Sequence, residues 1–332
     1  MFSILQHTIT SKIRKHLGLS LITCLMAALL FSAAARATEN GGSVYPVGAE
    51  TVLQGLQPAP HGTNLATFTL LITANEVDGP NGQAAPIDFK LRVFGNAVKI
   101  EHNWGIPVFG GTLVSTAAVP VLYEQVREGS SFATSNKITQ FGLSNCMLVP
   151  VGVAYHKKNW HGFYQVDFYP PGAPYSTAAG KLNTGEHNFA LSPVGAFTYL
   201  SDKEKWEVSS KVDYIINFTD NNPAPAGGNK SYRSGNEMTW EYTAMRAVSK
   251  KAALGFNGYL YQQVTGDQAN GIAVAGGNKG RDLAVGPQLR VFFGKHSAFA
   301  VKYFRDTLVE NKPRGNGFWF ETGFPLNFGK KK

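Results

Sequence analysis

The chain has 332 residues and a formal net charge of +9, with 43% hydrophobic, 12% aromatic and only 16% charged residues. Soluble domains carry about 25% charged residues, so this protein is short of charge for its length. The aromatic content excludes a disordered chain, and the two cysteines exclude a disulfide scaffold or a multi-cysteine metal cluster. The basic balance raises the question of a nucleic-acid partner.

The first 37 residues have the layout of a secretory signal peptide. A basic start is followed by an apolar run, 17–35, which ends in the small-residue cleavage pattern Ala35-Arg36-Ala37. The run is long enough for a membrane anchor, but its alanine-rich end and the cleavage pattern favour removal. A lipoprotein is disfavoured, because Thr23 precedes Cys24, and the residue before a lipidated cysteine is normally very small. We expect residues 1–37 to be cleaved off.

Removal of the signal peptide changes the charge. It carries four basic residues and no acidic one, which leaves 27 basic and 22 acidic residues and a net charge of +5. Three of these positive charges lie in Lys330–Lys332, which we interpret as part of a solvated tail, 329–332. The remaining charge is too small and too scattered for a nucleic-acid-binding surface. The one remaining cysteine, Cys146, is expected to pack as a small hydrophobic residue.

The mature chain shows the period of two that is typical of β-strands. In 204–220, Trp206 and Val208 fall on one parity, whereas Glu207 and Lys211 fall on the other. Because side chains alternate along a strand, one face is apolar and the other polar. Similar patterns separated by turn residues predict strands at 64–77, 87–104, 110–128, 139–156, 159–169, 186–200, 204–220, 231–248, 250–264, 281–294, 297–310 and 316–328.

The connections between these strands alternate in length. The short ones lie near 157–158, 201–203, 249 and 295–296, and the longer ones near 170–185, 221–230, 265–280 and 311–315. This alternation is typical of outer-membrane barrels, and Trp104, Trp160 and Trp240 at strand ends fit their aromatic girdles. The alternative, a soluble β-sandwich or two β domains, predicts an aliphatic core and a heavily charged face. We therefore predict an all-β fold, a transmembrane antiparallel β-barrel of about 12 strands over residues 64–328.

Several short motifs resemble a known family. They are the run from Glu39 to Gly48 at the mature start, Gly280-Arg281-Asp282 before a strand, and the closing Gly317-Phe318-Trp319-Phe320. With them the chain resembles the meta-pathway phenol degradation protein family of outer-membrane transporters. The resemblance implies a barrel that passes hydrophobic or aromatic compounds across the outer membrane. The tail departs from the usual pattern, because Gly329 and three lysines follow Phe328, where outer-membrane strands commonly finish on an aromatic residue.

No segment carries a persuasive catalytic or metal-binding motif. Asn229 interrupts the only phosphate-loop-like run, 227–231, and the histidines lack the spacing of a metal pair. His161 and Asp167 share one strand but lie about 20 Å apart at the rise of a strand, so they cannot form a catalytic pair. There is no Gly-x-Ser-x-Gly nucleophile motif. We expect no enzymatic activity, no cofactor and no metal.

The polar parity of the strands predicts the lining of a lumen. A charge that faces lipid at mid-membrane costs about 2–4 kcal/mol, so charged residues must point inward. Their mixed signs favour mutual pairing in a narrow interior, whereas the alternative is an open pore. The Gly- and Pro-rich extension 38–63 is either a plug in the lumen or a periplasmic leader. The predicted lining residues are Lys90, Arg92, Glu207, Lys211, Asp213, Glu237, Glu241, Gln288, Arg290, Lys302 and Glu321.

Together these features predict a passive channel in the Gram-negative outer membrane, reached after signal-peptide cleavage, for small hydrophobic or aromatic compounds. Its expected partners are outer-membrane lipid, the solutes themselves and the barrel-assembly machinery. One alternative is a lipid-modifying hydrolase, which requires a serine, a histidine and a carboxylate that converge near the bilayer interface. The other is a closed structural or adhesive barrel.

Overall fold

The computed structural model describes residues 42–130, 136–172, 175–178, 181–223, 229–293 and 297–326. The predicted signal peptide, 1–37, and the basic tail, 329–332, lie outside the described residues. Within the described residues, no helix is long and apolar enough to cross a membrane.

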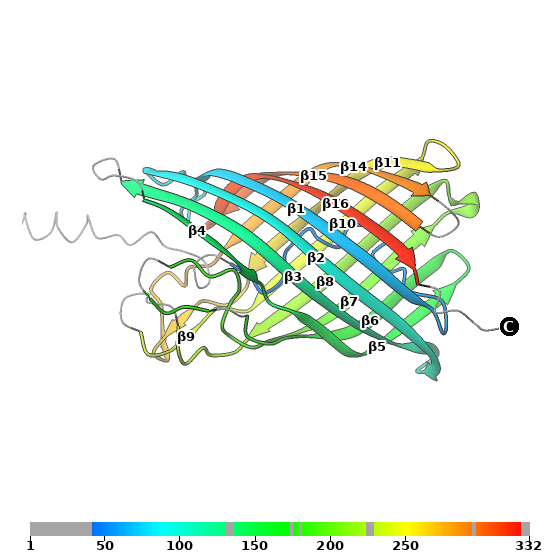
Figure 1. Cartoon of the computed structure of the whole chain (residues 1–332), viewed down its shortest axis with the longest axis horizontal. Coiled ribbons are helices and arrows are strands. Elements are labelled where there is room, and N and C mark those ends of the chain that lie inside the picture. Colours follow the sequence, from blue (N-terminus) through cyan, green and yellow to red (C-terminus); the bar gives the residue numbers. More distant parts are fainter. Residues whose placement is uncertain are drawn as a thin grey trace, which may run out of the picture. The chain divides into compact units, whose positions relative to one another are not determined.

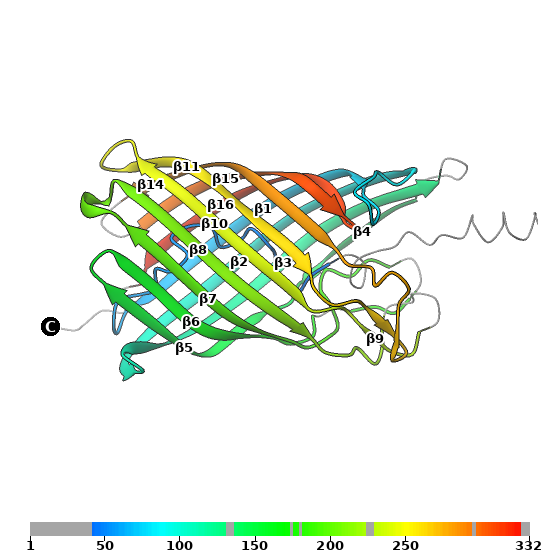
Figure 2. The same cartoon turned by 180° about the vertical axis from the view of Figure 1, so that it is seen from behind.

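The chain forms a closed antiparallel β-barrel with tilted strands (Figures 1 and 2). The sheet contains 13 strands around 12 positions, because β4 and β5 pair one after the other with β3. The predicted transmembrane β-barrel of about 12 strands is confirmed. Its strands are β1 (Thr63–Val77), β2 (Ile87–Val108), β3 (Gly111–Ser130), β4 (Asn136–Leu143), β5 (Met147–Lys157), β6 (Trp160–Tyr169), β7 (Ala190–Leu200), β8 (Trp206–Asn217), β10 (Glu237–Ala247), β11 (Ala252–Gln263), β14 (Arg281–Phe293), β15 (Ser297–Glu310) and β16 (Pro313–Pro325).

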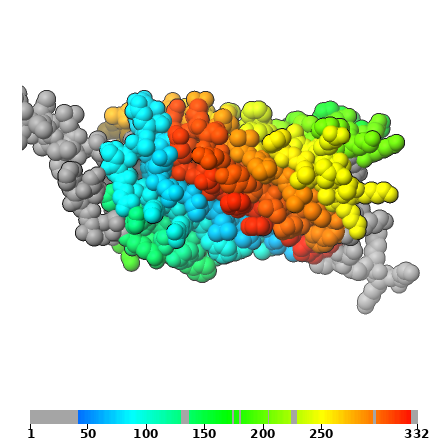
Figure 3. Space-filling model, turned by 90° about the horizontal axis from the view of Figure 1, so that it is seen from above, coloured from blue at the N-terminus to red at the C-terminus, as the bar shows by residue number. Residues whose placement is uncertain are grey.

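The first and last strands close the barrel. β1 pairs with β16 from Asn64 opposite Pro325 to Val77 opposite Pro313, with one bulge between Ala74 and Glu76. Figure 3 shows the red C-terminal strands against the blue and cyan N-terminal strands on the outer surface. Every strand of the barrel except β4 is paired on both sides, so closure satisfies the backbone groups that open sheet edges would expose within a bilayer.

The barrel wall has its polar residues on the inner face and its apolar residues on the outer face, the reverse of a soluble barrel. On β8, Glu207 and Lys211 point inward and are buried, whereas Trp206 and Val208 point outward and remain 52% and 46% exposed. A soluble protein would bury these apolar residues and expose the charges. This distribution excludes the soluble β alternative and matches a wall whose outer face contacts lipid.

The two ends of the barrel differ. At the turn end, short connections join β2 to β3, β5 to β6 and β10 to β11, and β1 starts beside the end of β16. At the loop end, long connections include a small sheet of β9 (Tyr232–Arg233), β12 (Gln268–Ala269) and β13 (Ile272–Ala273). The 3-10 turn η2 (Asp202–Glu204) joins β7 to β8 at the turn end.

The predicted strand 139–156 is interrupted by residues 144–146, which separate β4 from β5. The buried side chain of Asn145 lies at this break. Its Nδ2 donates to the carbonyl oxygens of Pro170 and Glu186 at 3.1 and 2.9 Å, and its Oδ1 accepts from the Glu186 N–H at 2.7 Å. Asn145 thus fastens the long connection after β6 to the break. Within the described residues, β4 pairs only with β3.

Candidate functional site in the barrel lumen

Residues 42–62, here called the inner segment, run through the lumen before β1 begins (Figures 1 and 2). Near the loop end, Ser43 Oγ donates to Glu237 Oε2 at 2.6 Å. At the turn end, the Asn103 N–H donates to the carbonyl oxygen of Gly62 at 2.9 Å. The sequence left open whether extension 38–63 is a plug or a periplasmic leader, and its described residues lie inside the barrel.

Glu50 of the inner segment bridges two nearly opposite walls of the lumen. Its carboxylate meets Lys99 Nζ on β2 at 2.6 Å and Lys211 Nζ on β8 at 2.8 Å. β2 and β8 stand five positions apart in the ring of 12. Each lysine also pairs with a wall carboxylate, Lys99 with Glu101 at 2.8 Å and Lys211 with Asp213 at 3.0 Å. Burial of these charges is tolerated because each one has an opposite partner.

A second set of contacts holds the backbone just before Glu50. Glu241 Oε1 on β10 accepts hydrogen bonds from the Tyr45 hydroxyl at 2.9 Å and from the Gly48 N–H at 2.5 Å. From the other side, Lys302 Nζ donates to the carbonyl oxygens of Gly48 and Ala49 at 3.3 and 2.5 Å. Gly48 has a φ of +89°, and a Cβ there would lie 3.0 Å from the Tyr259 ring, so both the backbone and the space require glycine.

Apolar side chains fill the lumen around the residues that hold Gly48 and Glu50. Val44 and Tyr45 pack against one wall, and Ala49 packs against another. The wall residues around Val44 and Tyr45 are Met147, Val149, Tyr169, Ala190 and Ile215, and those around Ala49 include Phe68, Leu70, Val93, Ala284, Phe304 and Trp319. The loop-end half of the inner segment therefore packs like a protein core rather than lining an open bore.

Further along, the inner segment touches the barrel wall through its backbone. The Leu53 N–H donates to Glu207 Oε1 at 3.3 Å, and the other oxygen of Glu207 pairs with Arg290. The Gly55 N–H donates to Thr198 Oγ1 on β7 at 2.9 Å. A Cβ on Gly55 would lie 2.5 Å from the backbone of Phe197 and Thr198, so the segment and β7 touch main chain to main chain.

Nine of the eleven predicted lining residues do point into the barrel. They are Glu207, Lys211, Asp213, Glu237, Glu241, Gln288, Arg290, Lys302 and Glu321. Gln288 Oε1 accepts from Thr51 Oγ1 at 3.2 Å, and Glu321 Oε2 pairs with Lys302 Nζ at 3.2 Å. Most of them thus hold the inner segment or one another, and whether they line a route for solutes stays a prediction.

The inward placement of Lys90 and Arg92 was wrong. Both are exposed on the outward parity of β2, while Phe89 and Val93 occupy the inward parity. Both parities of 87–104 contain apolar residues, so the alternation gave no clear choice of face. The inward residues Lys99 and Glu101 were missed for the same reason. Both lie on the parity opposite to Lys90, and this shared parity of two charged residues could have indicated the inward face.

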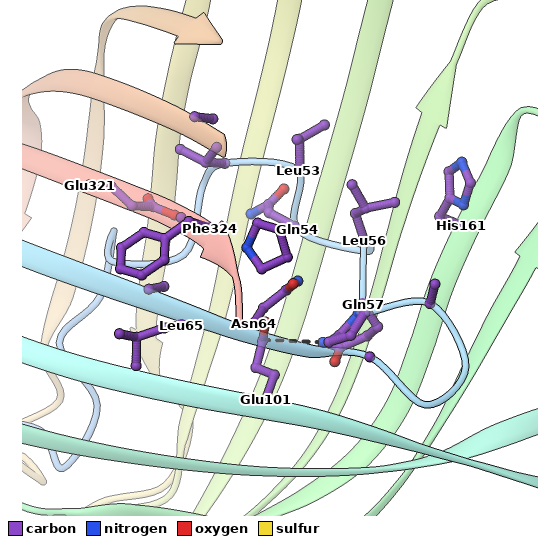
Figure 4. Close-up of a pocket in the computed structure, with 18 of the residues that line it drawn as sticks. Leu53, Gln54, Leu56, Gln57, Asn64, Leu65, Glu101, His161, Glu321 and Phe324 are labelled. Carbon is purple, nitrogen blue, oxygen red and sulfur yellow. Dashed lines mark hydrogen bonds between the residues drawn. The ribbon is translucent and has the colours of Figure 1, made fainter. Parts of the chain in front are cut away.

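The turn-end half of the lumen contains a cavity of about 1330 Å³ (Figure 4). The inner segment contributes Leu53, Gln54, Leu56 and Gln57, and the wall contributes Leu65, Glu101, His161, Glu321 and Phe324. Figure 4 shows Gln57 beside Glu101, to which its Nε2 donates at 3.5 Å. A volume of this size accommodates a small organic molecule together with water.

Two histidine contacts bear on the hydrolase and metal predictions. His187 Nδ1 lies 2.9 Å from Asp220 Oδ1 at the loop end. His156 Nδ1 and His161 Nδ1 lie 2.9 Å apart at the turn end. In the part of the chain that the structure describes, no group of three or more His, Cys, Asp or Glu side chains could hold a metal ion.

The fold and its contents define a transmembrane β-barrel whose lumen is crossed by its own N-terminal segment. Residues 74–322 match the family described as "Putative MetA-pathway of phenol degradation", and the chain belongs to this family. This match confirms the family predicted from the sequence motifs. A search of the curated proteins found no match.

A solved structure shares the barrel fold. The COG4313 outer membrane channel from Pseudomonas putida F1 is similar to this chain with a TM-score of 0.68 and 16% identity, over 86% of this chain and 100% of that one. The translocator domain of the autotransporter NalP from Neisseria meningitidis is more distant, with a TM-score of 0.43 and 12% identity, over 82% and 91% of the two chains.

Proposed function

We propose that this protein is an outer-membrane channel for the passive passage of small solutes, among them hydrophobic and aromatic compounds. The single observation that carries this proposal is the cavity of about 1330 Å³ inside a lipid-facing barrel. The likeness of the fold to an outer membrane channel and the membership of a family associated with phenol degradation add support. The proposal includes no covalent chemistry.

The inner segment sets how far the proposed channel opens. It fills the middle of the lumen through Tyr45, Gly48 and Glu50, which bind the walls by hydrogen bonds and ion pairs. A continuous route therefore requires this part of the segment to shift. This displacement is a population shift between two states rather than unfolding of the barrel.

The remaining sequence-based expectations belong to this proposal. The chain is exported by a cleaved leader, 1–37, inserted by the barrel-assembly machinery and surrounded by outer-membrane lipid. Its outward apolar residues, such as Phe94, Val98 and Val212, fit that lipid environment.

Reconstitution tests the function. Purified mature protein in planar bilayers is expected to give discrete conductance steps, and in liposomes it is expected to speed the entry of a small aromatic solute. Liposomes that contain heat-inactivated protein serve as the control. Solute entry no faster than in the control, together with an absence of conductance steps, would contradict the channel.

A closed structural barrel is the second candidate, and the packing of Val44, Tyr45 and Ala49 across the lumen favours it. The same reconstitution separates the two functions, because a closed barrel gives no conductance in the wild type or in variants with a weakened inner segment.

A further inference from the structure

The turn-end cavity contains buried polar atoms that no protein group satisfies. Both Gln54 Nε2 and Gln54 Oε1 lack a hydrogen-bond partner among the described residues, as do Gln57 Oε1, Thr116 Oγ1 and Gln165 Oε1. All four residues line the same cavity, and each is at most 8% exposed. A buried polar group without a partner costs about 1–3 kcal/mol, so a cluster of them favours any ligand that supplies the missing hydrogen bonds.

These groups come from both sides of the cavity. Thr116 on β3 lies directly opposite Glu101 in the β2–β3 register, and Glu101 holds the amide nitrogen of Gln57. Gln57 and Thr116 therefore both neighbour Glu101, on the same side of the cavity. Gln165 on β6 has its Nε2 committed to Asp167 Oδ1 at 2.7 Å, which leaves its oxygen toward the cavity. The inner segment carries Gln54, shown in Figure 4.

The chemistry of the cluster indicates the kind of ligand. Three of the five atoms are amide oxygens that only accept, one is an amide nitrogen that only donates, and the threonine hydroxyl can do either. Hydroxyl groups satisfy such a set, because they donate to the oxygens and accept from the nitrogen. Carbonyl groups alone would leave the three amide oxygens unmet.

The ion pairs around the cavity favour an uncharged ligand. The inner charges already have partners, Lys99 with Glu50 and Glu101, and Arg290 with Glu207. A charged solute bound among these pairs would lose its hydration without gaining an unpaired counter-ion from them. The lining also includes apolar side chains, among them Leu56, Leu65, Phe163, Phe292 and Phe324, while Lys203 and Lys250 line it from short connections at the turn end.

We infer that the inner segment and strands β3 and β6 together form a binding site for an uncharged, hydroxyl-bearing molecule with an apolar, ring-sized body. The inference deepens the proposed function and rests on it, since it names the solute class that the channel binds. Because Gln54 and Gln57 belong to the inner segment, the ligand contacts the same element that restricts the lumen.

Calorimetric titration of the folded full-length mature protein in detergent tests the site. The probes are 1,2-benzenedimethanol, which carries two hydroxyls, the phthalate dianion and the benzylammonium cation. The dialcohol is expected to bind, and Gln54→Leu is expected to weaken it by about fivefold to tenfold, because two hydrogen bonds are lost. Both charged probes are expected to bind at least about tenfold more weakly than the dialcohol.

Two further variants keep the test decisive. Gln140→Leu, on β4 and outside the cavity, corrects for partition into micelles and is expected to retain wild-type affinity. Thr116→Val removes one hydroxyl isosterically and is expected to weaken binding by about threefold, even if Gln54→Leu fails to fold. Equal affinity for all three probes, or unchanged affinity in both cavity variants, would overturn the inference.

The outcomes also separate this inference from the proposed function. Conductance without selective binding of the dialcohol contradicts the site and leaves the channel standing. Selective binding that depends on Gln54, without any conductance, contradicts the channel and leaves the site standing.

Discussion

The two halves of the inner segment lie in the same lumen but meet the wall in different ways. In residues 43–51, Tyr45, Gly48 and Glu50 find matched partners on several strands. In residues 53–62, Gln54 makes no hydrogen bond with the described residues, and the surroundings open into a cavity. The first half is thus an anchor, whereas the second half leaves polar groups available to a ligand.

This difference shows how one short segment can both narrow the lumen and supply it with polar groups that bind a ligand. Ion pairs and core-like packing fix its position, which in turn holds the unsatisfied amides of Gln54 and Gln57 at the cavity. Substitutions in the first half should therefore change stability and opening, whereas substitutions of the Gln54 and Gln57 side chains in the second half should change binding alone.

The largest effect on stability is expected at Lys211, which neutralises both Glu50 and Asp213 inside the barrel. Lys211→Met leaves these carboxylates without their shared cation and should lower the free energy of unfolding by about 3–5 kcal/mol. Urea unfolding in lipid vesicles, followed by tryptophan fluorescence, measures it. The exposed Lys251→Met is the control, and equal effects of the two variants would contradict the anchor.

Gly55 tests the backbone contact between the second half of the inner segment and β7, without a change of charge. In Gly55→Ala the new methyl group would clash with the β7 backbone, so the segment must shift, at a cost of about 2 kcal/mol. Gly79→Ala, whose Cβ meets only an ordinary contact at 3.7 Å, should be near neutral. The same unfolding assay compares the pair, and a harmless Gly55→Ala would show that the segment does not rest on β7.

A substitution at Tyr45 distinguishes the contribution of its hydrogen bond to stability from that of its packing. Tyr45→Phe keeps the ring against its apolar cluster but removes the hydrogen bond to Glu241, which should cost about 1.5 kcal/mol. Tyr123→Phe, on the outward face of β3, is the matched control. If both variants unfold at the same urea concentration, the Glu241 contact does not contribute to the anchor.

The smallest effect is expected at Gln54. Gln54→Leu removes a buried amide that makes no hydrogen bond with the described residues, so stability should stay within about 0.5 kcal/mol or rise by about 1 kcal/mol. A loss above about 2 kcal/mol in the unfolding assay would show that the amide supports the fold and does not face a free site.

The sequence predicted the wall better than it predicted the contents of the lumen. β8 was predicted with the correct faces, because Glu207, Lys211 and Asp213 share one parity and most residues on the other parity are apolar. In β2 the faces were misjudged at Lys90, where both parities are partly apolar. The break around Asn145 depends on a loop that returns about 40 residues later, which a local pattern cannot show.

The inner segment itself could be predicted only as one of two alternatives. Its residues have no period, because they contact walls on all sides rather than one face of a sheet. The partners of Glu50, Lys99 and Lys211, are 49 and 161 residues away in the sequence. Only the closure of the barrel brings them together, so the anchor and the cavity follow from the three-dimensional structure.

Single-channel conductance of the mature protein and its Glu50→Gln variant tests most directly whether the inner segment restricts the channel. The substitution removes the charge that joins β2 to β8, while Lys99 and Lys211 keep their second partners, Glu101 and Asp213. We predict that Glu50→Gln raises the mean conductance by about twofold or more, with Glu310→Gln unchanged. Equal conductance in the wild type and in Glu50→Gln would contradict this role.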